Sequence, residues 1–190
     1  MDKPGSLWLA RHALPLIAPG TCYGALDVRA DEAATLQAAA VLAAELPGGV
    51  AVACSPLQRC AQLAEALSAL RPDLPVTHDT RLREMNFGVW EGRLWSDIGE
   101  PALAAWTADF AQHRPGGGDS VETFMARVAE AWDALDDTPT LWITHAGVIR
   151  AVALLRAGSR SINRADAWPR TALAYGGWMR LDVPGAVSQW

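Results

Sequence analysis

Short apolar runs alternate with longer segments of helical pattern along this chain, and this alternation constrains the fold more than any other feature. The runs have the character of buried strands and occupy residues 7–10, 50–54, 76–78, 140–144 and 175–183. The segments between them favour helices at residues 31–46, 55–69, 96–113, 119–135 and 147–155. Strands alternating with helices predict a three-layer α/β/α sandwich around a mostly parallel sheet. We find no repeat or linker, so we expect one domain over residues 1–190.

Local signals support several of the predicted helix boundaries. Asp31 stands where an N-cap residue is expected, just before an apolar helical pattern. Asp119 and Glu122 have the spacing of a capping box for the helix at residues 119–135. The three glycines at residues 116–118 form either a hinge in front of that helix or a plain loop.

Composition excludes several classes of protein. Of the 190 residues, 51% are hydrophobic, which argues against a disordered or fibrous chain. The formal net charge of −5 argues against nonspecific nucleic-acid binding, although local arginines can still bind a small anion. Three cysteines without a CxxC spacing predict neither a disulfide framework nor a zinc site. No stretch resembles a membrane span or a signal peptide, so we expect a cytoplasmic protein.

Basic side chains stand at the ends of the predicted strands. One strand ends at Arg11 and His12, another ends at His145, and a third leads into a helix whose first turn carries Arg59. Ligands of open parallel sheets bind outside the carboxyl ends of the strands, so these four side chains are candidates for one cleft. Guanidinium groups and helix N-termini suit a phosphate dianion, and no carboxylate cluster accompanies them to hold a metal.

Four segments resemble the signatures of the histidine phosphatase (phosphoglycerate-mutase-like) superfamily, and they occur in the order of that family. They read L-A-R-H-A at residues 9–13, C-S-P-L-Q-R-C-A-Q-L-A-E at 54–65, L-R-E-M-N-F-G-V-W-E-G at 82–92 and T-H-A-G-V-I-R at 144–150. Any one segment would be a weak signal, whereas four in order are a strong one. The resemblance implies the phosphoglycerate-mutase-like α/β/α fold.

The resemblance also implies a role for each matching residue. His12 would attack phosphorus and become a transient phosphohistidine. The side chains of Arg11, Arg59 and His145, together with the backbone N–H of Ala146, would hold the phosphoryl oxygens. Glu84 would protonate the leaving alcohol and then accept a proton from water. No metal or other cofactor is implied.

Two positions depart from the family pattern. Ala13 and Ala146 stand where the signatures have glycine. Glycine often permits a positive φ or a close approach of a ligand. An alanine is tolerated if the backbone there is ordinary helix or strand, so the shape of the phosphate pocket is the feature in question.

Residues 20–27, G-T-C-Y-G-A-L-D, are similar to a segment of the α-ribazole phosphatase branch. This similarity implies a phosphatase for a small phosphorylated substrate, with α-ribazole 5′-phosphate as the leading candidate. It places Cys22 and Tyr23 at the mouth of the cleft, and Trp90 either lines the pocket or serves packing. A phosphoglycerate-type mutase and a noncatalytic phosphate-binding module are the alternatives. Edge strands or exposed tryptophans could support a homodimer.

Overall fold

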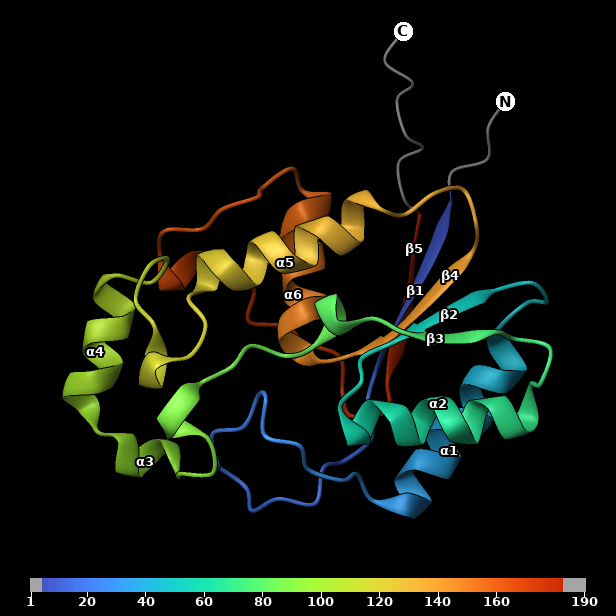
Figure 1. Ribbon diagram of the computed structural model, residues 1–190, viewed down its shortest axis with the longest axis horizontal. Coiled ribbons are helices and arrows are strands. Elements are labelled where there is room, and N and C mark those ends of the chain that lie inside the picture. Colours follow the sequence, from blue (N-terminus) through green and yellow to red (C-terminus); the bar gives the residue numbers. More distant parts are fainter. Residues whose placement is uncertain (1–4, 183–190) are drawn as a thin grey trace, which may run out of the picture.

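A five-stranded sheet forms the centre of the protein (Figure 1). The computed structural model describes residues 5–182. In the order β3-β2-β4-β1-β5, the first four strands are parallel and β5 runs antiparallel to β1. The strands are β1 (Ser6–Arg11), β2 (Ala51–Cys54), β3 (Val76–His78), β4 (Thr140–Thr144) and β5 (Trp178–Asp182). The predicted fold class, helices around a mostly parallel sheet, is confirmed.

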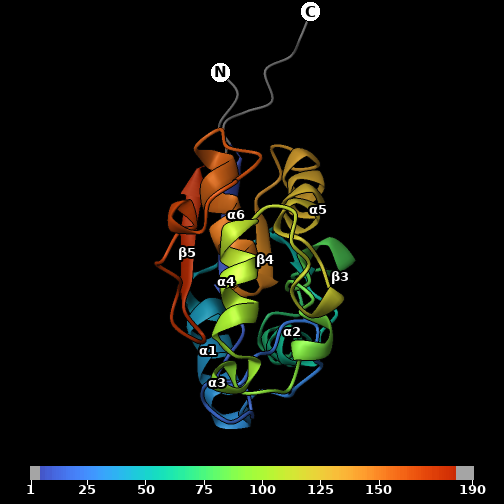
Figure 2. The ribbon, with the colours of Figure 1, turned by 90° about the vertical axis from the view of Figure 1, so that its left-hand side faces the viewer.

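Helices cover both faces of the sheet. Helices α1 (Glu32–Glu45) and α2 (Gln58–Leu70) pack on one face, and α5 (Val121–Asp133) and α6 (Ala146–Arg156) on the other. Helices α3 (Trp95–Ile98) and α4 (Glu100–Ala108) stand apart from these layers in Figure 1, and α4 lies in front of them in the view of Figure 2. Four 3₁₀ turns complete the elements: η1 (Thr80–Leu82), η2 (Gly88–Trp90), η3 (Pro115–Gly117) and η4 (Ala165–Ala167).

The strand sequences explain why both faces are covered. Successive side chains of a strand point to opposite faces of the sheet. In β1, Leu7 and Leu9 belong to the core under α5 and α6, whereas Trp8 and Ala10 belong to the core under α1 and α2. Because both sets are apolar, the strand needs a helical layer on each side, as parallel sheets generally do.

Several predicted helical boundaries differ from the structure. The helix predicted at residues 55–69 is α2, which begins at Gln58. The predicted helix at residues 96–113 is broken at Gly99, whose φ of 88° lies in the left-handed region, and its second part ends at Ala108. The cap of α5 is Ser120, whose Oγ accepts a hydrogen bond from the Thr123 amide at 3.1 Å. Asp119 instead accepts from the Asn86 amide at 3.1 Å, so the proposed capping box was wrong by one residue.

The candidate hinge and the last strand also take definite positions. Gly116 and Gly118 pack directly against residues 86–88, and a Cβ atom at Gly116 would overlap the Phe87 carbonyl, whereas a Cβ atom at Gly117 would have no neighbour within 4 Å. Residues 175–177 form a turn before β5, and Val183, the last residue of the predicted strand, lies outside the described residues.

Asp31 caps α1 as expected, since its Oδ1 accepts from the Ala34 amide at 2.8 Å. No helix within residues 5–182 is long and apolar enough to cross a bilayer.

The cap of α5 can be tested by its effect on stability. Replacing Ser120 by Ala leaves the Thr123 amide without its side-chain acceptor, so the free energy of unfolding should fall by about 1 kcal/mol. Urea denaturation measures this, with the exposed Glu130→Ala in the same helix as a control that should stay within about 0.5 kcal/mol of wild type. Equal stability of Ser120→Ala and wild type would contradict the assigned cap.

Candidate active site

The pairing of β1 with β4 brings the two candidate histidines together. Arg11 and Thr144 are register partners at the carboxyl ends of these strands, and the His12 amide donates to the Thr144 carbonyl at 3.1 Å. The rings of His12 and His145 consequently lie with their centroids 5.2 Å apart. Both residues are buried.

The local contacts of His12 select one tautomer. Its Nδ1 lies 2.8 Å from the Ala13 carbonyl oxygen, which can only accept a hydrogen bond, so Nδ1 carries the proton. The other ring nitrogen, Nε2, then holds a free lone pair. Burial lowers the pKa of His12 to about 3, with the charges of Arg59 and Arg11 adding to this effect against the Ala13 hydrogen bond. The ring is therefore neutral at physiological pH.

His145 is fully enclosed and is also neutral. Its Nε2 lies 2.8 Å from the hydroxyl of Ser55, the residue that follows β2, and 3.5 Å from the Cys60 thiol. Burial holds the pKa of His145 well below its ordinary value, and the charge of Arg59 is the next cause. The chain thus keeps two uncharged imidazoles beside two arginines.

Arg59 is fully buried in the first turn of α2. Its guanidinium donates to the carbonyls of Leu26 at 2.9 Å and Gly24 at 2.6 Å. Its Nε has no partner, and no carboxylate within residues 5–182 forms an ion pair with it. A buried charge without a counter-ion is costly, so this arrangement favours binding of an anion.

Arg11 repeats this pattern at the end of β1. It donates to the Leu173 carbonyl at 2.7 Å, and its guanidinium lies 3.9 Å from the centroid of the Tyr175 ring. Among the described carboxylates, none pairs with it. The Tyr175 hydroxyl lies 2.9 Å from that of Tyr23, whose ring faces Arg59 at 5.3 Å. Two linked tyrosines therefore flank the two guanidinium groups.

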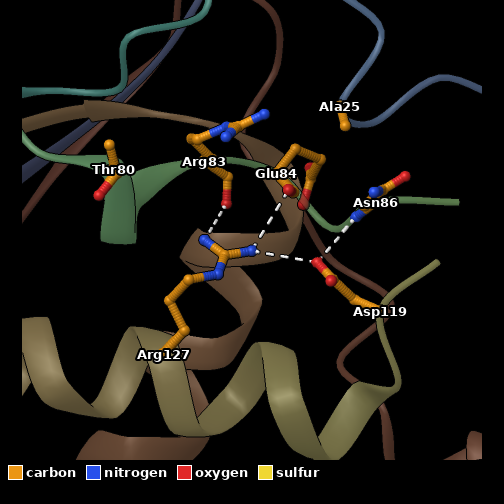
Figure 3. A pocket seen from close by; sticks show the side chains of 7 residues that line it. All are labelled: Ala25, Thr80, Arg83, Glu84, Asn86, Asp119 and Arg127. Carbon is orange, nitrogen blue, oxygen red and sulfur yellow. Dashed lines mark hydrogen bonds and ion pairs between the residues drawn. The ribbon is translucent and has the colours of Figure 1, made fainter. Parts of the chain in front are cut away.

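The backbone of the Leu82–Glu84 segment is tied to β4 and to α5. The Thr144 hydroxyl donates to the Leu82 carbonyl at 2.8 Å. From α5, Arg127 donates to the carbonyl of Arg83 at 2.8 Å and lies 3.4 Å from that of Glu84, as Figure 3 shows. These bonds fix the main chain from which the Glu84 side chain projects.

The Glu84 carboxylate itself is held by backbone amides. Its Oε2 accepts from the Gly147 amide at 2.9 Å and its Oε1 from the Met85 amide at 3.0 Å. A Cβ atom at Gly147 would overlap the carboxylate, which explains why glycine stands at the second position of α6. The carboxylate is thereby placed against the start of the helix that follows His145.

Glu84 lies between two cavities. A polar cavity of about 300 Å³ is lined by Ala25, Thr80, Arg83, Glu84, Asn86, Asp119 and Arg127 (Figure 3). A second cavity of about 540 Å³ is lined at one end by Arg11, His12 and Glu84, with Tyr23, Tyr175 and Ala146 beside them. Six further rings line this second cavity and are called the aromatic wall: Phe87, Trp95, Trp106, Phe110, Phe124 and Trp168.

Comparison with protein families gives a match over almost the whole chain. The sequence pattern of the histidine phosphatase superfamily (branch 1) matches residues 7–183. This chain belongs to that superfamily. The resemblance predicted from the four segments is thus confirmed.

Curated relatives of this histidine phosphatase carry two different names. The chain is 33% identical to a glucosyl-3-phosphoglycerate phosphatase of Mycolicibacterium vanbaalenii, over 70% of the chain and 61% of that protein. It is 31% identical to an adenosylcobalamin/alpha-ribazole phosphatase of Salmonella typhimurium, over 70% of the chain and 66% of that protein. The aligned part thus spans less than two thirds of these relatives.

Solved structures agree with the family. A mycobacterial glucosyl-3-phosphoglycerate phosphatase superposes with a TM-score of 0.75 at 27% identity, covering 94% of this chain and 90% of the other. A protein of Thermus thermophilus superposes with a TM-score of 0.69 at 29% identity, covering 95% of each chain.

The two alanines of this histidine phosphatase that replace family glycines have ordinary backbones. No residue other than glycine has a positive φ within residues 5–182. Ala13 is buried and supplies the carbonyl that orients His12, while Ala146 begins α6 directly after His145. Neither position needs the conformational freedom of glycine, so the added methyl groups are accommodated.

The structure separates the three predicted substrate-pocket residues. Tyr23 lines the larger cavity. Cys22 and Trp90 instead pack with Ile98 in a small apolar cluster, and neither lines the cavities described above. A distant segment holds Cys22 there, because its amide and carbonyl are both hydrogen-bonded to residues 92–93. Burial raises the pKa of its thiol to about 12.

Glu91, which the sequence offered with Trp90 as either a pocket-lining or a packing residue, has a different role in the structure. Its carboxylate accepts hydrogen bonds from three consecutive amides, those of Gly24, Ala25 and Leu26, at 2.8 to 3.0 Å, and from the Phe87 amide at 2.8 Å. The carbonyls of residues 24 and 26 are the acceptors for Arg59. Glu91 therefore fixes the loop that positions this arginine. The W-E-G segment is the only sequence signal for it.

Glu91→Gln should disturb both stability and anion binding. A glutamine offers one acceptor oxygen and turns its NH₂ group toward backbone donors, so the free energy of unfolding should fall by about 1–3 kcal/mol. Inorganic phosphate should also bind more weakly by calorimetry, because the Arg59 acceptors are displaced. The exposed Glu45→Gln is the matched control. Unchanged phosphate affinity in Glu91→Gln would remove the link to Arg59.

The neutral state of His12 predicts a specific pH behaviour. Its pKa in the folded chain is far below the ordinary 6.5, so the unfolded chain binds the extra proton first as pH falls. Stability from this group is thus present above about pH 6.5 and is lost as pH drops toward 3. Long-range ¹H–¹⁵N NMR at pH 5.5 should show a neutral Nδ1–H ring, assigned with His12→Asn. Titration of that ring near 6.5 would contradict the neutral assignment.

Proposed function

We propose that this protein is a metal-independent phosphomonoesterase that works through a phosphohistidine intermediate. The observation that carries the proposal is the neutral, buried His12 beside two guanidinium groups that lack a carboxylate partner within residues 5–182. A phosphate dianion would supply the missing negative charge, and the free lone pair of Nε2 would supply the nucleophile. The names of the curated relatives, all phosphatases, support the same activity.

The proposed reaction has two displacements at phosphorus. In the first, a bond forms between His12 Nε2 and phosphorus while the ester P–O bond breaks, and the Glu84 carboxyl gives its proton to the leaving alcohol. In the second, water attacks the phosphohistidine, Glu84 takes the proton from that water, and the P–N bond breaks. Inorganic phosphate leaves and His12 returns to its neutral form.

The remaining groups would hold the phosphoryl oxygens. Arg11 and Arg59 would bind them with N–H donors, and the positive charge would stabilise the transition state. His145 and the backbone N–H of Ala146, at the start of α6, would contact the same group. The hydrogen bond between the Nδ1 of His12 and the Ala13 carbonyl keeps the attacking ring oriented during both steps.

The leading substrate is α-ribazole 5′-phosphate. Residues 20–27 resemble the corresponding segment of the α-ribazole phosphatase branch, and the Salmonella relative carries that activity in its name. Glucosyl-3-phosphoglycerate is the competing substrate, because other relatives are named for it. A mutase is a further alternative. A noncatalytic phosphate-binding module would need the arginines but neither a neutral nucleophile nor the carboxylate of Glu84.

Several wider expectations stay predictions. They are a single domain over residues 1–190, a location in the cytoplasm, no nucleic-acid partner, and assembly into a homodimer.

Phosphate release from a panel of esters in the presence of EDTA tests the proposed function. The panel contains α-ribazole 5′-phosphate, 3-phosphoglycerate and p-nitrophenyl phosphate. Activity should survive the chelator and disappear in His12→Asn, which keeps a polar side chain but has no ring nitrogen to attack phosphorus. Phosphate release that is retained in His12→Asn would count against the phosphohistidine mechanism, and so would a folded protein that releases phosphate from none of these esters.

Glu84→Gln tests the role of the general acid. Loss of the proton donor should lower kcat for alkyl phosphates by about 10² or more, because an alkoxide is a poor leaving group. The loss should be far smaller for p-nitrophenyl phosphate, whose leaving group needs little protonation. Steady-state kinetics on both substrates measures the difference, and equal losses would assign Glu84 a structural role instead.

A further inference from the structure

The larger cavity continues from His12 into a lining that the phosphate chemistry does not use. The aromatic wall comes from four separate parts of the chain. They are the loop after η1 with Phe87, the α3–α4 region with Trp95, Trp106 and Phe110, helix α5 with Phe124, and the segment after η4 with Trp168. Figure 1 shows α3 and α4 standing apart from the helical layers of the sheet. This part of the cavity is therefore built largely by elements outside the helical layers of the sheet.

The rings of the aromatic wall contact one another in a continuous series. Phe87 packs edge-on against Trp95 and Trp106, with centroids 5.5 and 5.9 Å apart. Trp106 stacks on Phe110 at 5.6 Å with an interplanar angle of 23°. Phe110 then meets Trp168 at 6.1 Å, edge-on. Mutual packing holds these rings in place, so the cavity presents preformed flat apolar surfaces.

Charged groups are scarce in this part of the cavity. Arg11 and Glu84 lie at the phosphate end. Among the other described residues that line the cavity, Arg150 is the one that carries a charge. The Arg150 guanidinium lies 3.3 Å from the Arg170 carbonyl, while its Nε and the Trp106 Nε1 are buried donors without a hydrogen-bond partner. A ligand rich in hydroxyl groups would lose its water here and find few hydrogen-bond partners in return, which is costly. A flat uncharged ring would bury its faces without that penalty.

From these features we infer that the aromatic wall is the binding site for a flat, uncharged aromatic ring system carried by the alcohol part of the phosphate ester. The inference rests on the proposed function and narrows its substrate class to nucleotide-like monoesters. Trp106 and Trp168 are the specificity-determining residues, because each lines the cavity and contacts other rings of the wall. Esters whose alcohol bears a carboxylate and hydroxyl groups are disfavoured.

Two ribose phosphates that differ in the presence of a flat base test this inference. α-Ribazole 5′-phosphate and ribose 5-phosphate share the same phosphorylated sugar, and only the former carries a flat base. Wild type should show a kcat/KM at least about tenfold higher for the ring-bearing ester. Trp106→Leu and, separately, Trp168→Leu should remove most of this preference through KM while ribose 5-phosphate changes by less than about twofold.

Two further variants separate specificity from other effects. Trp132→Leu makes the same chemical change at a half-buried tryptophan of α5 that does not line the cavity, and it should keep the preference. Arg150→Gln should leave the preference intact as well. Equal turnover of the two ribose esters by wild type, or a preference for 3-phosphoglycerate that Arg150→Gln abolishes, would overturn the inference.

Failure of the proposed function would look different. In that case none of the esters, p-nitrophenyl phosphate included, would release phosphate, or the release would persist in His12→Asn. If turnover depends on His12 but the tryptophan variants lower it equally on both ribose esters, the function stands and the aromatic wall is structural.

Discussion

The buried guanidinium of Arg59 is the feature on which the rest of the site depends. It sits in the first turn of α2, fully enclosed, with backbone carbonyls as its acceptors and no carboxylate pairing with it in the described part of the chain. Its charge is among the causes that keep both His12 and His145 neutral. A neutral imidazole next to a buried cation without a counter-ion favours binding of an anion.

This arrangement requires a rigid support, because carbonyl oxygens hold a guanidinium only while their loop stays in place. Glu91 supplies that support through bonds to three consecutive amides, and it ties the same loop to Phe87 at the edge of the aromatic wall. The phosphate end and the ring-lined end of the cavity are thereby built on one hydrogen-bonded framework. The arginine proposed to bind phosphate and the wall proposed to bind the alcohol are therefore connected through one loop.

Glu84 joins this framework from the opposite side. Its main chain is held by Thr144 and Arg127, and its carboxylate is held by the amide of Gly147. The side chain lines both the polar cavity and the ring-lined one. This position suits the role proposed for Glu84, which is to give a proton and then to take one.

The sequence by itself determined the order of strands and helices, because alternating apolar runs report burial directly. Its four signature segments also indicated Arg11, His12, Arg59, Glu84 and His145. In the structure Arg11, His12 and Glu84 line one end of a cavity, whereas His145 is buried beside His12 and Arg59 is buried beside Tyr23. Only the tertiary structure decided which aromatic residues line that cavity, since Phe87 packs on Trp106, and Phe110 packs on Trp168, across long separations in the chain. It also moved Cys22 and Trp90 away from the cavity and gave Glu91 its role. These outcomes depend on hydrogen bonds between distant loops, for which local sequence patterns carry no signal.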